Sequence, residues 1–585
     1  MYLRTNKVKR PDGRVDEYIR LVESYWNEGS PRHRVICNLG RKDLLAPHAD
    51  ALLRILKGEK EPKRPDKGTS AVGAWDWGPL LVGGHFWRHL GLEAIIDSLG
   101  HGSELADRAL ALVANRLCEP TSEHGIARWL ETDFVCDRHG NRWLPEWRDD
   151  AERLASGRPR VRVKDKQLRQ WYGTLDGLIA NKKEIEKELF LRLRNLFSLN
   201  VDMVFYDLTS TYFEGNGPAM AKHGHSRDGK PRNRQVLVGQ VMIDGWPIAH
   251  HVFEGNQRDS STVKSVLADL QARFGLRRVV FVGDRGMVTS DNIDLLRSQE
   301  QGYVVGLNRR RRPEVLRYVE RATGPWLECP PGIAASEKAQ PPKTLVQEVA
   351  SEKAGVRIFV VHSDERLDYE RGEREKSMQR VREQLENLKQ RVSQGKLKAP
   401  EKIGAAASRI LARNHGSRYY DWELKDGQFH YFEHPINLKQ ERAVEGKYLI
   451  QSEEKELSAL EAVAVYKELS EVERAFASLK DVIEMRPIYH QKNRRTEAHI
   501  FVASLAFLLD RALEKKLKSA GVDISSKEAW QLLKTVRVVD IDLGEGQNKR
   551  SVTQGSVRAA KILKSVGVRN LDPDAAGKQR DIVTH

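Results

Sequence analysis

The chain has 585 residues, of which 40% are hydrophobic and 31% are charged. This length is too great for one hydrophobic core and indicates several domains. The longest apolar helical stretch, 500–509, is shorter than the roughly 20 residues that cross a bilayer, so no membrane span is expected. Lys and Arg outnumber Asp and Glu by 98 to 82, and the net charge of +16 favours a polyanionic partner.

The N-terminal segment has cations but no apolar run behind them, so we expect no secretory signal and a cytoplasmic location. The four cysteines include no Cys-x-x-Cys pair. Cys136 with His139 has the only spacing of a metal-binding kind, and half a site does not indicate zinc.

The first 199 residues divide into two predicted parts. Residues 1–70 read as a small β-rich region that ends in a polar linker, 58–70. Residues 71–199 read as a helical region that is expected to bind DNA. Its basic run, 158–170, is either a phosphate contact or a solvated face. The tryptophans of this region are expected in its core: Trp75, Trp77, Trp87, Trp129, Trp143, Trp147 and Trp171.

The stretch 203–215, which is mainly apolar, β-branched and aromatic, predicts a buried strand that contains one acid, Asp207. A buried carboxylate needs a cation or hydrogen-bond donors, so Asp207 indicates either a metal or partner, or a turn with Thr209 and Ser210. A second apolar run at 278–286 ends in a second acid, Asp284.

The pattern between and after these acids predicts the order β-β-β-α-β-α-β. Two runs that predict strands, 235–243 and 246–255, flank an Asp-Gly turn. A helix capped by Ser260 or Ser261 follows, with Asp259 as part of the cap. The first and fourth strands should be neighbours, which would bring Asp207 and Asp284 side by side.

Residues 311–450 are predicted to form a β-rich insertion that begins in the basic run before Pro313. Its long helix carries apolar residues at spacings of three and four. The helix is expected to pack on the insertion's own strands, since two heptads are too few to indicate a coiled coil. The apolar residues of this helix are Met378, Val381, Leu385, Leu388 and Val392.

A third acid lies on a predicted amphipathic helix that starts with the capping box Ser458 and Glu461. Tyr466, Glu473 and Lys480 are seven residues apart and form one stripe beside the apolar face. Glu473 either faces the two aspartates or is an exposed glutamate in an i,i+4 network.

Asp207 in YDLTS, Asp284 in VGDRG and Tyr466-x6-Glu473-x6-Lys480 resemble the DDE transposases of bacterial insertion sequences. The likeness is to the insertion-sequence-four (IS-four) superfamily and covers about 200–520. The signature of that superfamily is Y-x2-R-x3-E-x6-K, and this chain has Leu469 where the signature has Arg.

The resemblance implies an α/β, ribonuclease-H-like mixed-sheet core, formed by 200–310 and 451–520 and interrupted by the insertion, with a basic C-terminal region at 521–585. It implies two Mg2+ ions, with Mn2+ as a substitute, held by Asp207, Asp284 and Glu473. Carboxylates are hard oxygen ligands of the kind that Mg2+ accepts. The implied DNA contacts are Tyr466, Lys480, Arg285, Arg309, Arg310, Arg311 and Arg312.

The implied function is cleavage and strand transfer of double-stranded DNA, between the element's terminal inverted repeats and a target. Relatives with this signature commonly release the element through a hairpin. The resemblance also implies a homodimer in the synaptic complex and a place at the bacterial nucleoid. Two alternatives remain, a nuclease that cuts without joining and a catalytically silent DNA-binding protein.

Two further basic groups are candidates for DNA or dimer contacts, with solvated loops as the alternative. The first is Arg486, His490, Lys492, Arg494 and Arg495, and the second is Lys549, Arg550, Arg558, Lys561 and Lys564.

Overall fold

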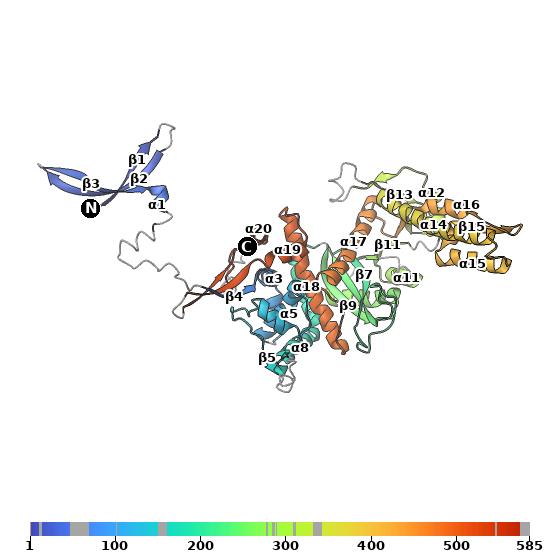
Figure 1. The fold of residues 1–585 in the computed structure, drawn as a ribbon, viewed down its shortest axis with the longest axis horizontal. Coiled ribbons are helices and arrows are strands. Elements are labelled where there is room, and N and C mark those ends of the chain that lie inside the picture. Colours follow the sequence, from blue (N-terminus) through green and yellow to red (C-terminus); the bar gives the residue numbers. More distant parts are fainter. Residues whose placement is uncertain are drawn as a thin grey trace. The chain divides into compact units, whose positions relative to one another are not determined.

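The computed structural model describes residues 2–10, 15–27, 29–46, 49, 70–100, 102–149, 161–199, 201–276, 279–283, 287, 289–307, 312–330, 342–543 and 547–573. Within these ranges no helix is long and apolar enough to cross a membrane. The chain divides into two compact units, Met1–Ala74 with Val539–Ser551, and Trp75–Val538 with Val552–His585 (Figure 1).

The first unit contains a three-stranded antiparallel sheet in the order β1-β2-β3. Its elements are β1 (Tyr2–Lys9), β2 (Val15–Asn27), β3 (Ser30–Arg41) and the short helix α1 (Lys42–Leu45). The strands predicted for this region are therefore present, whereas most of the predicted linker lies outside the described residues. A further sheet has the order β19-β18-β4. It is formed by β4 (Ser70–Asp76), β18 (Arg537–Asp542) and β19 (Asn548–Val552).

Four of the seven tryptophans that are predicted for the core of the helical region are buried, whereas Trp75 and Trp143 are partly buried against that core and Trp147 is half-buried. Trp77, Trp87, Trp129 and Trp171 are all at most 4% exposed. Helices α5 and α8 of this region pack against the long helix α18 (Asn493–Ser519), which joins the region to the rest of the unit. The elements are α3 (Gly78–His89), α4 (Leu92–Asp97), α5 (Ser103–Cys118), α6 (Ile126–Thr132), β5 (Trp147–Asp149), β6 (Val161–Val163), α8 (Asp165–Ala180) and α9 (Lys182–Phe197).

A nine-stranded sheet forms the centre of the second unit, in the order β12-β13-β14-β17-β11-β10-β7-β8-β9. β7 pairs antiparallel with β8 and parallel with β10, and β10 pairs parallel with β11. This is the ribonuclease-H-like order, and the predicted first and fourth strands are neighbours. The strands are β7 (Met203–Tyr212), β8 (Gln235–Ile243), β9 (Trp246–Glu254), β10 (Val280–Gly283) and β11 (Gly302–Gly306).

The turn between β8 and β9 has the predicted Asp-Gly chemistry. Asp244 has φ 50° and Gly245 has φ 68°, the left-handed pair that a two-residue hairpin turn requires. The remaining elements of the core are η2 (Asp259–Thr262), α10 (Val263–Phe274), α11 (Ser290–Ser298) and α17 (Ala459–Asp481). The predicted helix cap is wrong, because neither η2 nor α10 has a side-chain cap hydrogen bond.

The segment predicted as a β-rich insertion places its strands differently from the prediction. β12 (Leu327–Glu328), β13 (Thr344–Val349), β14 (Arg357–Ser363) and β17 (Lys447–Ser452) extend the central sheet. The separate core of the insertion is mainly helical, with one hairpin. It contains the five predicted helix residues together with Tyr420 and Phe429 of that hairpin. Its elements are α14 (Asp364–Ser393), α15 (Pro400–Arg413), η4 (Gly416–Arg418), β15 (Tyr420–Lys425), β16 (Gln428–Glu433) and α16 (Pro435–Val444).

Three more helices complete the described fold. α12 (Arg312–Arg321) packs with its apolar face on β14 and α16. After α18, helix α19 (Ser526–Leu533) packs against α3, α5 and α20 (Val557–Val566).

Candidate active site

Asp207 lies in the middle of β7, opposite Gln240 of β8. Its neighbours Tyr206 and Leu208 are buried, while Asp207 is half-buried. The Leu208 amide N–H donates to Asp207 Oδ1 at 2.7 Å. Because β7 is paired on both sides, the backbone that carries this carboxylate is fixed by the sheet.

Tyr206, the residue before Asp207 on β7, anchors this strand to Thr262. Its hydroxyl donates to Thr262 Oγ1 at 3.0 Å, and burial raises the pKa of this phenol well above its usual range. A Cβ on Gly239 of β8 would lie 2.6 Å from the same hydroxyl, so the close approach of the ring requires glycine there.

Glu473 is presented by α17. The helix begins with the predicted capping box, in which Ser458 Oγ accepts from the Glu461 N–H and Glu461 accepts from the Ser458 N–H. Val472 and Phe476 are buried beside Glu473, which is itself exposed. α17 contacts β7, β10 and β11, so its apolar face is seated on the sheet and Glu473 lies at the edge of that contact.

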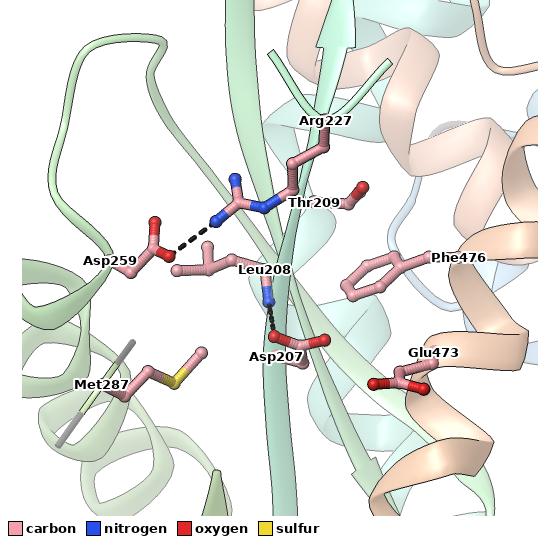
Figure 2. A pocket seen from close by; sticks show the side chains of 8 residues that line it. All are labelled: Asp207, Leu208, Thr209, Arg227, Asp259, Met287, Glu473 and Phe476. Atoms are coloured by element: carbon pink, nitrogen blue, oxygen red, sulfur yellow. Dashed lines mark hydrogen bonds and ion pairs between the residues drawn. The ribbon is translucent and has the colours of Figure 1, made fainter. Parts of the chain in front are cut away.

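Asp207 and Glu473 line one pocket, of about 240 Å³. Figure 2 shows their carboxylates pointing toward one another from β7 and α17. The two residues are far apart in the sequence, and the fold brings them to the same cavity. The other lining residues are Leu208, Thr209, Arg227, Asp259, Met287 and Phe476.

Asp284 lies outside the described residues, as does Arg285. The described chain on either side of them borders the same site. Gly283, the last residue of β10, pairs with Tyr206, which immediately precedes Asp207. Met287 lines the pocket.

An ion pair between Arg227 and Asp259 occupies another wall of the pocket, and sequence reasoning missed it (Figure 2). Arg227 Nη2 donates to Asp259 Oδ2 at 2.6 Å, and the Arg227 N–H donates to Ser210 Oγ. Arg227 comes from the loop between β7 and β8, where no periodic pattern marks a residue as inward-facing. For Asp259 the sequence favours a helix cap, because Ser260 and Ser261 follow it.

Tyr466 does not line the pocket. It is half-buried against Tyr448, with ring centroids 5.8 Å apart. A Cβ on Gly306 at the end of β11 would lie 2.2 Å from the Tyr466 hydroxyl. Tyr466 therefore packs over the end of β11. This strand belongs to the same sheet as β7, which carries Asp207.

Lys480 is held by a buried acid. Its Nζ lies 2.7 Å from Asp228 Oδ1, and Arg486 Nη1 lies 2.5 Å from the same oxygen. The Asp228 side chain is 1% exposed, so this carboxylate is stabilised by both cations. Asp228 follows Arg227, and one loop thus contacts both the pocket and the end of α17.

The predicted arginines after β11 remain largely untested. Arg309, Arg310 and Arg311 lie outside the described residues, and Arg312 is described only as the first residue of α12. In the C-terminal basic group, Arg550 pairs with Asp540 and Arg558 pairs with Glu528.

A second cluster of side chains that could bind a metal ion lies elsewhere in the described structure. Atoms of Glu123, His490 and His499 lie within 4.8 Å of one another. Both ring nitrogens of His499 already have hydrogen-bond partners. Nδ1 lies 3.3 Å from Arg116 Nη2, and Nε2 lies 3.1 Å from the Met485 carbonyl oxygen. Burial lowers the pKa of His499 well below its usual value. We interpret this group as a structural polar network, because the Arg116 guanidinium would repel a cation there.

A family model of the transposase DDE domain matches residues 203–509, which is more than half of the chain. The chain belongs to the DDE transposases. A second model, the N-terminal domain of IS1634 family transposases, matches residues 3–67 of this transposase. These matches support the predicted identity as a DDE transposase of an insertion sequence, a DNA-binding enzyme.

A search of curated proteins gave no significant match to this transposase. Among solved structures, a piggyBac transposase synaptic complex with hairpin DNA is similar, at 12% identity and a TM-score of 0.32. That match covers 78% of this chain and 80% of the other. The strand order of the central sheet is that of a ribonuclease-H-like core.

Proposed function

We propose that this transposase cuts DNA at the terminal inverted repeats of an insertion sequence and joins those ends to a target, using Mg2+ held by Asp207, Asp284 and Glu473. The observation that carries the proposal is the shared pocket of Asp207 and Glu473 in a member of the DDE transposases. The pairing of Gly283 with Tyr206 supports a position for Asp284 beside them.

The donor set fits a divalent ion. DDE transposases use divalent metals, and carboxylate oxygens are the ligands that Mg2+ and Mn2+ prefer. Bound there, the metal would supply Lewis-acid stabilisation of charge at the reacting phosphate and activation of the attacking water or 3′-hydroxyl. No described histidine or cysteine lines the pocket, which favours a hard cation over zinc.

The protein's own contribution is rigid placement of the acids. β7 is hydrogen-bonded on both sides, and α17 is anchored by Leu469, Val472 and Phe476. Carboxylates on such elements need little reorganisation when substrate binds, so ordering them adds little to the activation free energy of the reaction.

Arg227 is a further proposed contact to DNA. Its guanidinium lines the pocket and is partly exposed, at 26% of its side-chain area. Asp259 compensates its charge and orients it, and a phosphate entering the pocket would offer Arg227 a second acceptor. Tyr466, Lys480 and the arginines predicted from sequence stay proposed DNA contacts.

The function is tested with a duplex that carries the inverted repeats flanking the coding sequence, a supercoiled target and the purified transposase. We expect cleaved ends and joined products in Mg2+ or Mn2+ and neither in EDTA. Cleavage without joining would identify a nuclease. Binding without cleavage in either metal would identify a silent DNA-binding protein, and both results would overturn the proposal.

A further inference from the structure

A buried acid connects the helix that carries Glu473 with two helices that follow it in the chain. Asp510 lies on α18 and is 2% exposed. Ser478 of α17 donates from Oγ to Asp510 Oδ2 at 2.9 Å. Trp530 of α19 donates from Nε1 to Asp510 Oδ1, also at 2.9 Å. Each oxygen of the carboxylate thus accepts from a different helix, and Asp510 joins α17, α18 and α19.

Burial alone does not account for an acid at this position. The neighbours of Asp510 along α18, Leu508, Leu509 and Ala512, are buried apolar residues. A carboxylate among them costs free energy unless donors meet it, and an apolar residue avoids that cost. Burial raises the pKa of the Asp510 carboxyl above its usual value, even though its hydrogen bonds act in the opposite direction. What the acid adds is a directional link between the three helices.

The contact of α17 with the sheet lacks such direction. Val472, Phe476 and Leu479 form its buried apolar face. Apolar burial is not directional, so it limits only weakly how far a helix slides along its axis or turns about it. A hydrogen bond constrains both distance and angle. Ser478 follows Glu473 by about one and a half helical turns, so its bond to Asp510 fixes α17 close to the catalytic acid.

Helix α18 is a rigid reference for this bond. It packs against α5, α8, β9 and α20 as well as against α17 and α19. Trp530, which holds the second oxygen of Asp510, is itself 2% exposed. The acid therefore has one orientation, with one oxygen directed to α17.

We propose that Asp510 is a positioning residue for DNA cleavage. Through Ser478 it fixes α17, and with it the place of Glu473 relative to Asp207, and Trp530 holds Asp510 in the required orientation. Catalytic groups must be placed to within about 0.5 Å, which is finer than apolar packing alone provides. The inference rests on the proposed function, and it gives α19, outside the catalytic core, a part in the reaction.

The test uses three single variants of the full chain. Ser478→Ala removes the donor on α17, and Trp530→Phe removes the indole N–H but keeps an aromatic ring. Asp510→Asn is the conservative variant. Its amide oxygen can accept from Trp530, and its amide nitrogen can donate to the Ser478 hydroxyl, so both links persist.

Two matched controls remove the same groups where no hydrogen bond is lost. Ser504→Ala changes a buried serine of α18, and Trp171→Phe changes a buried tryptophan of α8, a helix that also packs on α18. Neither the Ser504 hydroxyl nor the Trp171 Nε1 has a hydrogen-bond partner among the residues that the structure describes. Thermal unfolding verifies that every variant is folded at the temperature of the assays.

We expect kcat for cleavage of end DNA in Mg2+ to fall roughly tenfold or more in Ser478→Ala and Trp530→Phe, because Glu473 is misplaced. KM should stay within about twofold of the parent, since no DNA contact is removed. Asp510→Asn and both controls should stay within about threefold of the parental kcat. A parental kcat in Ser478→Ala or Trp530→Phe, or an equal loss in the matched controls, would overturn the inference.

Hydrogen exchange gives a second readout that does not depend on cleavage. In Trp530→Phe, a change on α19, amides of α17 around Ser478 should exchange faster than in the parent, whereas Trp171→Phe should leave them unchanged. Unchanged exchange of α17 in Trp530→Phe would refute the link. An unmodified chain that never cleaves would refute the proposed function instead, and the exchange result would still decide whether Asp510 connects the helices.

Discussion

At the scale of single residues, Asp228 connects the pocket with the helix that carries Glu473. Its carboxylate binds Lys480 and Arg486, and the preceding residue reaches into the pocket. Lys480 is therefore partly neutralised before any DNA arrives. This residue fixes the loop between β7 and β8 to the end of α17.

Asp228→Asn should lower the free energy of unfolding by about 3 kcal/mol, because two partly buried cations lose their counter-ion. Asp481→Asn is the matched control, since Asp481 also pairs with Arg486 but is 66% exposed. Its cost should stay below about 1 kcal/mol. Denaturant unfolding measures both, and equal costs would contradict the assigned role of Asp228.

Gly306→Ala should destabilise the chain by about 1–3 kcal/mol, because the new Cβ would meet the Tyr466 hydroxyl at 2.2 Å. In the background of Tyr466→Phe, which lacks that hydroxyl, the same change should cost less. A double-mutant cycle of thermal unfolding measures the coupling. Additive effects would show that the two residues do not meet.

The sequence identified those site residues that lie on regular elements. Asp207 interrupts an apolar strand and Glu473 adjoins an apolar helix face, so both patterns marked them. Arg227 and Asp259 lie in a loop and at a loop end, where no period exists and a local cap explained Asp259 equally well.

At the scale of elements, local sequence patterns predict the strands and helices of the core. They do not predict which strands pair when those strands are far apart in the sequence. The Asp-Gly turn and the alternation of strands and helices gave the order of the first five core strands. β13 and β14 join the central sheet through β17, and the pairing of β17 with β11 brings together residues as distant as Val304 and Ser452. No local pattern encodes such a partner, so the sequence predicts β13 and β14 only as part of the insertion.

Ser458→Ala should lower stability by about 1 kcal/mol, since it removes the side-chain cap of α17. Ser470→Ala is the control, because Ser470 is an exposed residue inside the same helix. Cleavage activity should persist in both variants, since Glu473 lies several turns from the cap. A loss of stability in Ser470→Ala as large as in Ser458→Ala would show that the cap is unimportant.

At the scale of the whole molecule, one chain offers a single set of Asp207, Asp284 and Glu473, whereas transposition joins two ends to one target. We therefore predict a monomer without DNA and a dimer when two ends are bound. Light scattering of the chain with and without end DNA measures the mass. A complex of one chain and one end that completes strand transfer would refute the dimer.

The central claim, that the pocket of Asp207 and Glu473 performs the chemistry, is tested most directly by Mg2+-dependent cleavage of end DNA at saturating protein. Asp207→Asn and Glu473→Gln should each reduce the rate on the order of a hundredfold or more, with DNA affinity retained. Glu468→Gln, an exposed residue of α17 that does not line the pocket, should cleave at the parental rate. Near-parental cleavage by Asp207→Asn or Glu473→Gln would contradict the claim.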